Sequence, residues 1–180
     1  NVNLVLRTPI PKGEVWKGLT HLMQKYPNQV TIFQDFMEKN EWQQLLCDTD
    51  IFVLPSARIH VVSTLEAMSF GVPVVVSDGW GFSDYVDDGR TGIIIPGRYG
   101  VVSWYDENTG MLREDYEPMF SLNESFGERL CKELRHLINH PEKRKKIGES
   151  ARREVRERFN IENWNKSLKF VLDQTVEPEM

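Results

Sequence analysis

The sequence contains few cysteines and no long apolar run. Cys47 and Cys131 are the only cysteines in 180 residues, and they do not form a Cys-x-x-Cys pair. Two such thiols predict neither a disulfide framework nor a zinc ribbon, and they suit a reducing cytosol. The longest apolar runs, such as Val72–Val76, fall far short of the roughly 20 residues that span a bilayer. The sequence therefore predicts a cytoplasmic protein without a transmembrane helix.

The sequence also has fewer basic than acidic residues. The chain has 22 Lys and Arg residues against 27 Asp and Glu residues, a formal net charge of −5. A net negative surface does not attract a polyanion, so we expect no nucleic-acid partner. The hydrophobic content of 40%, with 11% aromatic residues, excludes a disordered chain. A chain of this length can bury the core of one domain.

The first residue is Asn1 rather than a methionine. The apolar run Val2–Leu6 predicts a strand, not a targeting signal. We therefore expect a fragment of a longer protein, folded as a single domain over residues 1–180.

Apolar spacing predicts alternating strands and helices along the first half of the chain. Strands are expected at Val2–Leu6, Val30–Phe33, Ile51–Leu54, Val72–Val76 and Ile93–Ile95, with helices around Trp16–Tyr26, Trp42–Leu46 and Val61–Phe70. This order predicts an α/β fold with a Rossmann-like parallel sheet and helices on both faces. Residues 97–121 form an acidic insertion, and three helical stripes follow, at Phe126–Ile138, Ile147–Phe159 and Ile161–Leu172.

Residues 55–68 join the carboxyl end of a strand to the beginning of a helix, where ligands of open parallel sheets bind. Glu66, one turn into this helix, can accept hydrogen bonds from two ribose hydroxyls. Alternatively, the run from Ser63 to Glu66 fits a capping box in which Glu66 bonds the Ser63 amide. The first helical turn also offers free amides that suit a phosphate, at Val61, Val62, Ser63 and Thr64.

Four motifs occur in order across about forty residues. They are Leu54-Pro55-Ser56, Leu65-Glu66-Ala67-Met68, Gly71-Val72-Pro73-Val74-Val75 and Asp88-Gly89-Arg90-Thr91-Gly92. Together they resemble the donor-binding, C-terminal lobe of the GT-B glycosyltransferases, specifically the retaining family 4 (glycosyl transferases group 1).

The resemblance implies a hexosyltransferase that moves a sugar from a nucleotide-activated donor to an acceptor with retention. It implies a metal-independent reaction with no cofactor besides the nucleotide-sugar substrate. The chain lacks the family's first βα unit and its N-terminal acceptor domain, so we expect the fragment alone to be inactive. The catalytic residues, the donor sugar and base, the acceptor and the linkage are not specified.

The family has two glutamates eight positions apart, of which Glu66 matches the second. Arg58 stands at the first position, where it either binds the diphosphate through its guanidinium or is a solvated loop residue. His60 either bonds a sugar hydroxyl or packs at the helix entry. The segment Arg7–Gly13 mimics the family's basic phosphate-binding pair. However, too few residues separate Gly13 from Asp50 for the further helix, strand and helix that the family has there. Val2–Leu6 therefore corresponds to the family's second strand, and the basic pair that follows the family's first strand is absent from this chain.

Other candidate positions follow neighbouring strands. Asp35 and Phe36 resemble the loop that borders the base, although Phe36 fits a core position equally well. Gly79 and Gly81 offer a loop that lets backbone approach a ligand, or else a simple turn. His136 and His140 are four apart on a helix but lack an acidic third ligand, so no metal site is expected.

The segment from Glu142 to Arg158 carries eight basic side chains, all between Lys143 and Arg158, against four acidic ones. Such a face can contact anionic lipid, which places the protein at the inner face of the membrane, or it can simply be solvated. Two other functions stay open. Arg58 in place of the glutamate fits a non-catalytic binding or scaffold module with a degenerate site, and a GT-B nucleotide-sugar epimerase matches the motifs less well.

Overall fold

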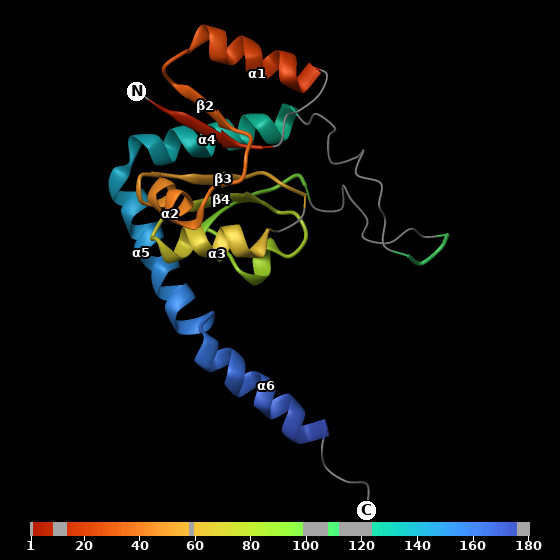
Figure 1. The fold of residues 1–180 in the computed structure, drawn as a ribbon. Helices are drawn as coiled ribbons and strands as arrows, with labels where there is room; N and C mark the ends of the chain where they lie inside the picture. The colour runs from red at the N-terminus through yellow and green to blue at the C-terminus, as the bar shows by residue number, and fades with distance from the viewer. Residues whose placement is uncertain (1, 9–13, 58–59, 99–107, 112–123, 176–180) are drawn as a thin grey trace, which may run out of the picture. The chain divides into compact units, whose positions relative to one another are not determined.

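The computed structural model describes residues 2–8, 14–57, 60–98, 108–111 and 124–175. The elements follow each other as β1 (Leu4–Arg7), α1 (Glu14–Lys25), β2 (Val30–Phe33), α2 (Lys39–Cys47), β3 (Phe52–Leu54), α3 (Val61–Ser69), β4 (Val74–Ser77), the 3-10 turn η1 (Phe82–Asp84), β5 (Gly92–Ile95), α4 (Glu124–Asn139), α5 (Pro141–Arg158) and α6 (Ile161–Thr175) (Figure 1). The predicted α/β class and the predicted order of elements are confirmed.

The chain divides into two compact units, residues 1–43 and 44–180. In the first unit β1 pairs in parallel with β2, and α1 packs against β2. In the second unit the strand order is β3-β4-β5, again with parallel pairs only. The parallel pairing is as predicted, but the strands form two sheets rather than one.

Helices cover both faces of the β3-β4-β5 sheet. All four residues of β4 are buried. Val75 belongs to a core cluster with residues of β5, α4 and α5, namely Ile93, Ile95, Phe126, Leu137 and Ile147. Because strand side chains alternate between faces, Val74 and Val76 face the opposite side. On that side lies α3, which packs against β4 and buries Ala67 and Met68.

The turn between α3 and β4 lies against the backbone of α5. Gly71 has a φ of +79° and provides a left-handed end to α3, as glycine commonly does after a helix. A Cβ built on Gly148 of α5 would lie 2.9 Å from the carbonyl carbon of Gly71 and would overlap its oxygen. β4 begins at Val74, later than predicted, because Pro73 has no amide hydrogen for the sheet.

Ion pairs and a side-chain acceptor organise the turn before β5. Arg90 bonds Asp87 at 2.5 Å and Glu154 of α5 at 2.8 Å, so it ties this turn to the helix. The hydrogen bonds that Arg90 donates, first to Asp87 and then to Glu154, raise the pKa of Arg90 above its usual value. Asp88 Oδ1 accepts the amide hydrogen of Ile94, which occupies a donor on the edge strand β5.

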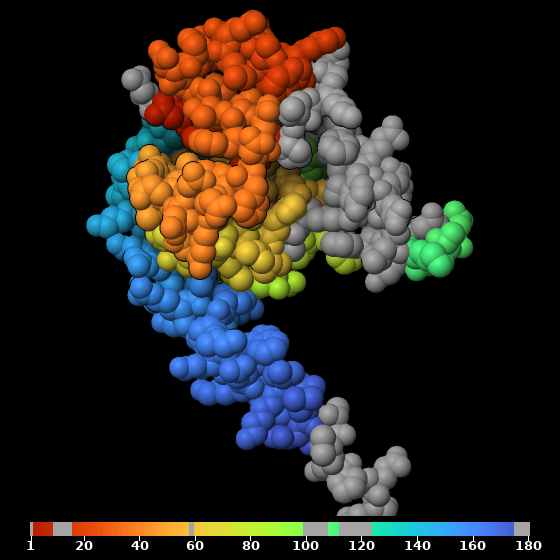
Figure 2. All heavy atoms as spheres, viewed as in Figure 1, coloured from red at the N-terminus to blue at the C-terminus, as the bar shows by residue number. Residues whose placement is uncertain are grey.

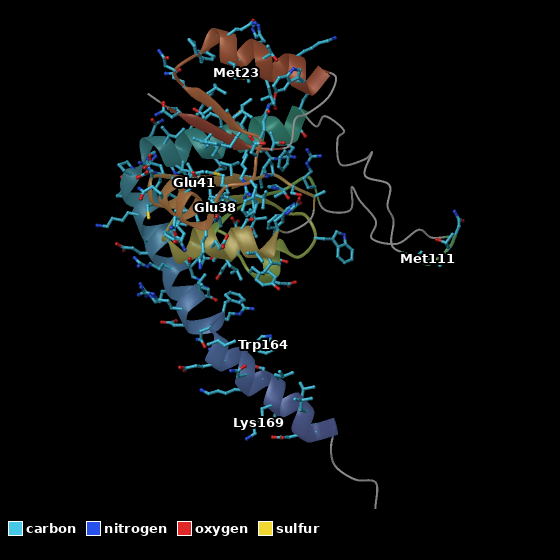
Figure 3. The ribbon with its side chains drawn as sticks, viewed as in Figure 1. Met23, Glu38, Glu41, Met111, Trp164 and Lys169 are labelled. Carbon is cyan, nitrogen blue, oxygen red and sulfur yellow. The ribbon has the colours of Figure 1, made fainter. Side chains whose placement is uncertain are left out.

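Helix α6 has one apolar face that is exposed to solvent. Its members are between 40% and 68% exposed, and they are Ile161, Trp164, Leu168, Val171 and Leu172. Figure 3 labels Trp164 and Lys169 on this helix, and Figure 2 shows its atoms in deep blue. Among the helices of the described ranges, none combines the length and the apolar character that crossing a membrane requires.

The predicted acidic insertion at 97–121 falls mostly outside the described residues, because only 97–98 and 108–111 of it are described. The acidic and aromatic side chains on which that prediction depends are therefore not placed. Residues 176–180 also lie outside the described residues.

Candidate functional site

Three loops meet at the carboxyl edge of the β3-β4-β5 sheet, because parallel strands end on the same side. They follow β3 at residues 55–60, β4 at 78–81 and β5 at 96–98. Arg58 and Ile59 lie outside the described part of the first loop. This edge also holds the beginning of α3, so it is the place at which the sequence predicts a ligand.

Side-chain and backbone hydrogen bonds join the first two loops. The hydroxyl of Ser77, which is fully buried, donates to the carbonyl oxygen of Ser56 and accepts the amide hydrogen of Gly79 at 3.1 Å. The amide of Trp80 donates to the carbonyl oxygen of Ala57 at 3.0 Å. The spacing of the two loops is therefore fixed by groups that are already paired.

The contact between these loops requires a glycine at position 79. A Cβ on Gly79 would lie 2.5 Å from the carbonyl oxygen of Ala57 and 2.8 Å from that of Ser56. Gly81, with a φ of 84°, precedes η1 in the left-handed conformation. Both glycines therefore have structural roles within the turn, and their direct contact with a ligand stays a prediction.

Asp78 joins the loop after β5 to the other two. Its amide donates to the carbonyl oxygen of Ile95 at 2.9 Å. Its carboxylate accepts the amide hydrogens of Gly97 at 2.9 Å and Arg98 at 2.5 Å. The sequence interpretation did not include this role. An aspartate directly after a buried strand and before a glycine is the signal that could have indicated it.

Helix α3 begins at Val61, with His60 as the preceding cap residue and no side-chain hydrogen bond at the cap. The first amides of a helix have no acceptor inside it, so those of Val61, Val62 and Ser63 are directed toward the carboxyl edge of the sheet. Thr64 differs from this expectation. Its amide and its hydroxyl both donate to the carbonyl oxygen of His60, at 3.0 and 2.9 Å, and its side chain is buried.

The capping-box interpretation of Glu66 is wrong. It requires Ser63 to precede the helix, but Ser63 is the third helical residue. Glu66 therefore lies in the second turn of α3. Thr64, Ala67 and Met68 form the buried face of this helix, and a residue at position 66 projects on the opposite side. The half-buried Glu66 thus faces away from the core, and its contact with a ribose stays a prediction.

The remaining candidates are placed as follows. His60 is exposed. Phe36 is 82% exposed, so the core interpretation of Phe36 is wrong, and Asp35 beside it is exposed as well. Both belong to the first unit, and their role in a base pocket stays a prediction. Arg7 lies with its guanidinium carbon 5.2 Å from the centroid of the Trp42 ring, a cation–π contact within the first unit.

The acidic residues Asp48 and Asp50, and the histidines His136 and His140, have partners in the structure. Asp50 accepts a hydrogen bond from Arg144 at 3.3 Å, and Asp48 accepts one from Gln44 at 3.0 Å. His140 precedes α5, and its ring lies 4.2 Å from that of His136, centroid to centroid. Within the described residues, no three His, Cys, Asp or Glu side chains are grouped as a metal site would require.

A cavity of about 400 Å³ lies along the outer edge of the sheet. It is lined by the turn before β5, by β5 and Pro96, and by α4, with Lys143 of α5. None of the predicted donor-binding residues lines it. The carboxyl-edge site is therefore defined by its loops and by α3, and not by this cavity.

The structure has parallel sheets flanked by helices, and its loops gather at the carboxyl edge beside the N-terminus of a helix. This is the α/β architecture of the GT-B glycosyltransferases. The model of the family glycosyl transferases group 1 matches residues 10–112, more than half of the chain. The chain belongs to this family.

Known proteins similar to the chain are longer than it is. Alpha-maltose-1-phosphate synthase of Mycolicibacterium smegmatis is 25% identical over 171 residues, which cover 94% of this chain and 37% of that protein. The Anabaena protein HepE, crystallised with UDP-glucose, has a TM-score of 0.64 at 19% identity, over 96% of this chain and 41% of its own. The C-terminal domain of the group 1 protein LpcC from Francisella tularensis has a TM-score of 0.57 at 16% identity, over 83% and 66% respectively.

Proposed function

We propose that this chain is the donor-binding, C-terminal lobe of a retaining hexosyltransferase of family 4. The observation that carries the proposal is the position of Glu66. It projects away from the core one turn inside a helix whose first amides lie at the carboxyl edge of the sheet. Such a helix end attracts a phosphate, while a carboxylate in its second turn suits neutral hydroxyl donors.

In this proposal the diphosphate of the donor lies at the beginning of α3. The amides of Val61, Val62 and Ser63 donate to its oxygens, and Glu66 accepts hydrogen bonds from the ribose hydroxyls. Arg58 adds a guanidinium to the diphosphate at the position where the family has its first glutamate. We also propose that donor binding is independent of a divalent cation.

The activity of the whole protein is part of the proposal. The chain spans about two-fifths of the relatives that it matches, and an acceptor site is expected from the remainder. The binding of UDP-glucose by HepE supports a nucleotide-sugar donor for this chain. We further infer that the chain alone does not transfer sugar, and that it works in the cytoplasm.

A second function is favoured by one feature, the arginine at position 58. If the exchange of glutamate for arginine abolished donor recognition, the chain would be a scaffold that retained the fold alone. A scaffold of this kind binds neither a nucleoside diphosphate nor a nucleotide-sugar. Measured binding therefore separates it from a donor lobe.

The test is titration calorimetry of the 180-residue chain with UDP, ADP and GDP and with their glucose conjugates, with and without EDTA. We expect weak binding of one nucleoside diphosphate and of its sugar conjugate, at the same affinity in both buffers. Binding that disappears in EDTA would exclude the metal-independent site. Absence of binding by all six ligands would leave the scaffold function.

A further inference from the structure

Trp80 lies in the middle loop of the candidate site, and its side chain is 43% exposed. It follows β4 between Gly79 and Gly81, at the carboxyl edge of the sheet. An indole has a large apolar surface that can pack against a ligand, and this one lies next to the predicted ligand site. No role was assigned to it from the sequence.

The backbone on both sides of Trp80 is anchored. Its own amide donates to the carbonyl oxygen of Ala57 at 3.0 Å. The preceding residue, Gly79, is buried against the backbone of that same loop, and Phe82 of η1 is fully buried. The Cα position of Trp80 is therefore fixed by its neighbours, so that little backbone freedom is lost when the indole receives a ligand.

Trp80 is also within reach of a group attached to the diphosphate. Its hydrogen-bond partner Ala57 precedes the cap residue His60 by three positions, and three residues span at most about 11 Å. The amides proposed to bind the diphosphate begin directly after His60. A sugar linked to that diphosphate can extend over part of this distance.

We propose that Trp80 is the stacking platform for the pyranose ring of the donor, a role that rests on the proposed nucleotide-sugar site. A pyranose presents a face of C–H groups that packs on the π-surface of an indole. Arg58 occupies the position of the family's first glutamate, and a guanidinium has no acceptor for sugar hydroxyls. Apolar stacking on Trp80 provides sugar contact of a different kind.

Saturation-transfer difference NMR on the 180-residue chain tests the assignment, because it reports which ligand protons touch the protein even when binding is weak. The ligands are UDP, UDP-glucose, and UDP mixed with free glucose, with the ADP or GDP equivalents if calorimetry selects another base. The variants are Trp80→Ala, Trp80→Leu and Trp80→Phe. The matched control is Trp164→Ala, which removes an exposed indole from α6.

We expect glucose-ring protons of UDP-glucose to be saturated strongly in the wild type, in the control and in Trp80→Phe. In Trp80→Ala and Trp80→Leu they should lose this saturation, while the base and ribose protons keep theirs. The affinity for UDP-glucose should fall by about 2- to 10-fold in these two variants, with the affinity for UDP unchanged. Trp80→Leu keeps an apolar side chain, so it retains a readout if the alanine variant does not fold.

Several results would overturn the assignment. Unchanged sugar saturation in Trp80→Ala or Trp80→Leu would exclude the indole as the platform. Loss of base rather than sugar saturation would assign Trp80 to the nucleobase. Saturation of free glucose, in the presence of UDP, without saturation of the UDP-linked sugar would move the contact to an acceptor. If the wild type binds no nucleotide, the proposed function itself fails, and this outcome is distinct from the other three.

Discussion

Gly148 of α5 and Gly71, which follows α3, are in backbone contact, so close that a Cβ at position 148 would overlap the carbonyl oxygen of Gly71. The two residues are far apart in the sequence and belong to different segments of the second unit. Their contact fixes the distance between α5 and the turn that leads into β4.

Gly148→Ala should therefore destabilise the fold. The added methyl group has to displace α5 from the turn, and overpacking of this kind costs about 1–3 kcal/mol. Urea unfolding of both proteins measures the loss. Gly127→Ala in α4 is the matched control, because nothing lies within 4 Å of its Cβ position, and it should gain up to about 1 kcal/mol from helix propensity. Equal effects of the two substitutions would contradict the contact.

Asp78→Asn should loosen the loop after β5. The carboxylate accepts two backbone amide hydrogens, from Gly97 and Arg98, and an asparagine amide group opposes one of them with its own N–H. We expect a loss of about 1–3 kcal/mol in the free energy of unfolding and faster hydrogen exchange at those two amides. The exposed Asp84→Asn serves as the control and should leave both measurements unchanged.

Glu66→Gln should weaken nucleotide binding with little effect on stability. The substitution keeps the shape of the side chain but removes one of its two acceptor oxygens, so the affinity for a nucleoside diphosphate should fall by about 1–3 kcal/mol. Because Glu66 projects away from the core, the melting temperature should change little. Lower stability with unchanged binding would instead indicate a purely structural carboxylate.

Arg58→Ala distinguishes contact with the diphosphate from contact with the sugar. If the guanidinium binds phosphate oxygens, the affinities for nucleoside diphosphate and nucleotide-sugar should fall by similar factors, while the affinity for the nucleoside stays the same. Calorimetry with the three ligands gives these ratios. A loss confined to the nucleotide-sugar would assign Arg58 to sugar recognition, and no change in any affinity would make it a solvated residue.

Contact of α5 with anionic lipid would depend on fewer basic side chains than the number of its charges indicates, because some of them have partners within the protein. Arg144 donates to the carbonyl oxygens of Leu137 and Ile138, and Arg158 pairs with Glu154. We expect Lys146→Gln with Arg153→Gln to reduce binding to phosphatidylserine vesicles by about 10-fold or more, since each cation near an anionic surface contributes about 1 kcal/mol.

The control for this measurement is Lys17→Gln with Lys25→Gln on α1, which removes the same charge from another helix. It should leave vesicle binding unchanged. Neutral phosphatidylcholine vesicles should bind none of the proteins, and higher salt should weaken the binding to anionic vesicles. Equal losses in the two double variants would show that only net charge matters.

The sequence predicts the elements well where periodicity and turn residues agree. Val30–Phe33 matches β2 in full, and Gly71, the residue type that favours a left-handed helix end, follows α3 with a positive φ. These features depend on near neighbours in the chain. The division of the strands into two sheets was not predicted, because pairing between distant strands leaves no mark on local apolar spacing.

The site shows the same limit. The position of α3 was predicted, but the alternative of a capping box at Ser63 is wrong, because the pattern of a capping box fits several starting points and Ser63 is the third residue of the helix. The roles of Asp78 and Gly79 depend on contacts with Gly97 and with Ala57, which lie on other loops. Phe36 was equally compatible with core and surface, since an aromatic residue next to a strand occurs in both.

The hydrogen bonds that join the three loops have a consequence for how the protein can evolve. In the described part of the loops, the groups that join them include backbone amides and carbonyls, which an exchange at a position such as 80 preserves unless it introduces a proline. A side chain such as that of Trp80 can therefore change while the spacing of the loops is inherited intact. A new donor preference can arise here by single substitutions that leave the stability of the fold nearly untouched.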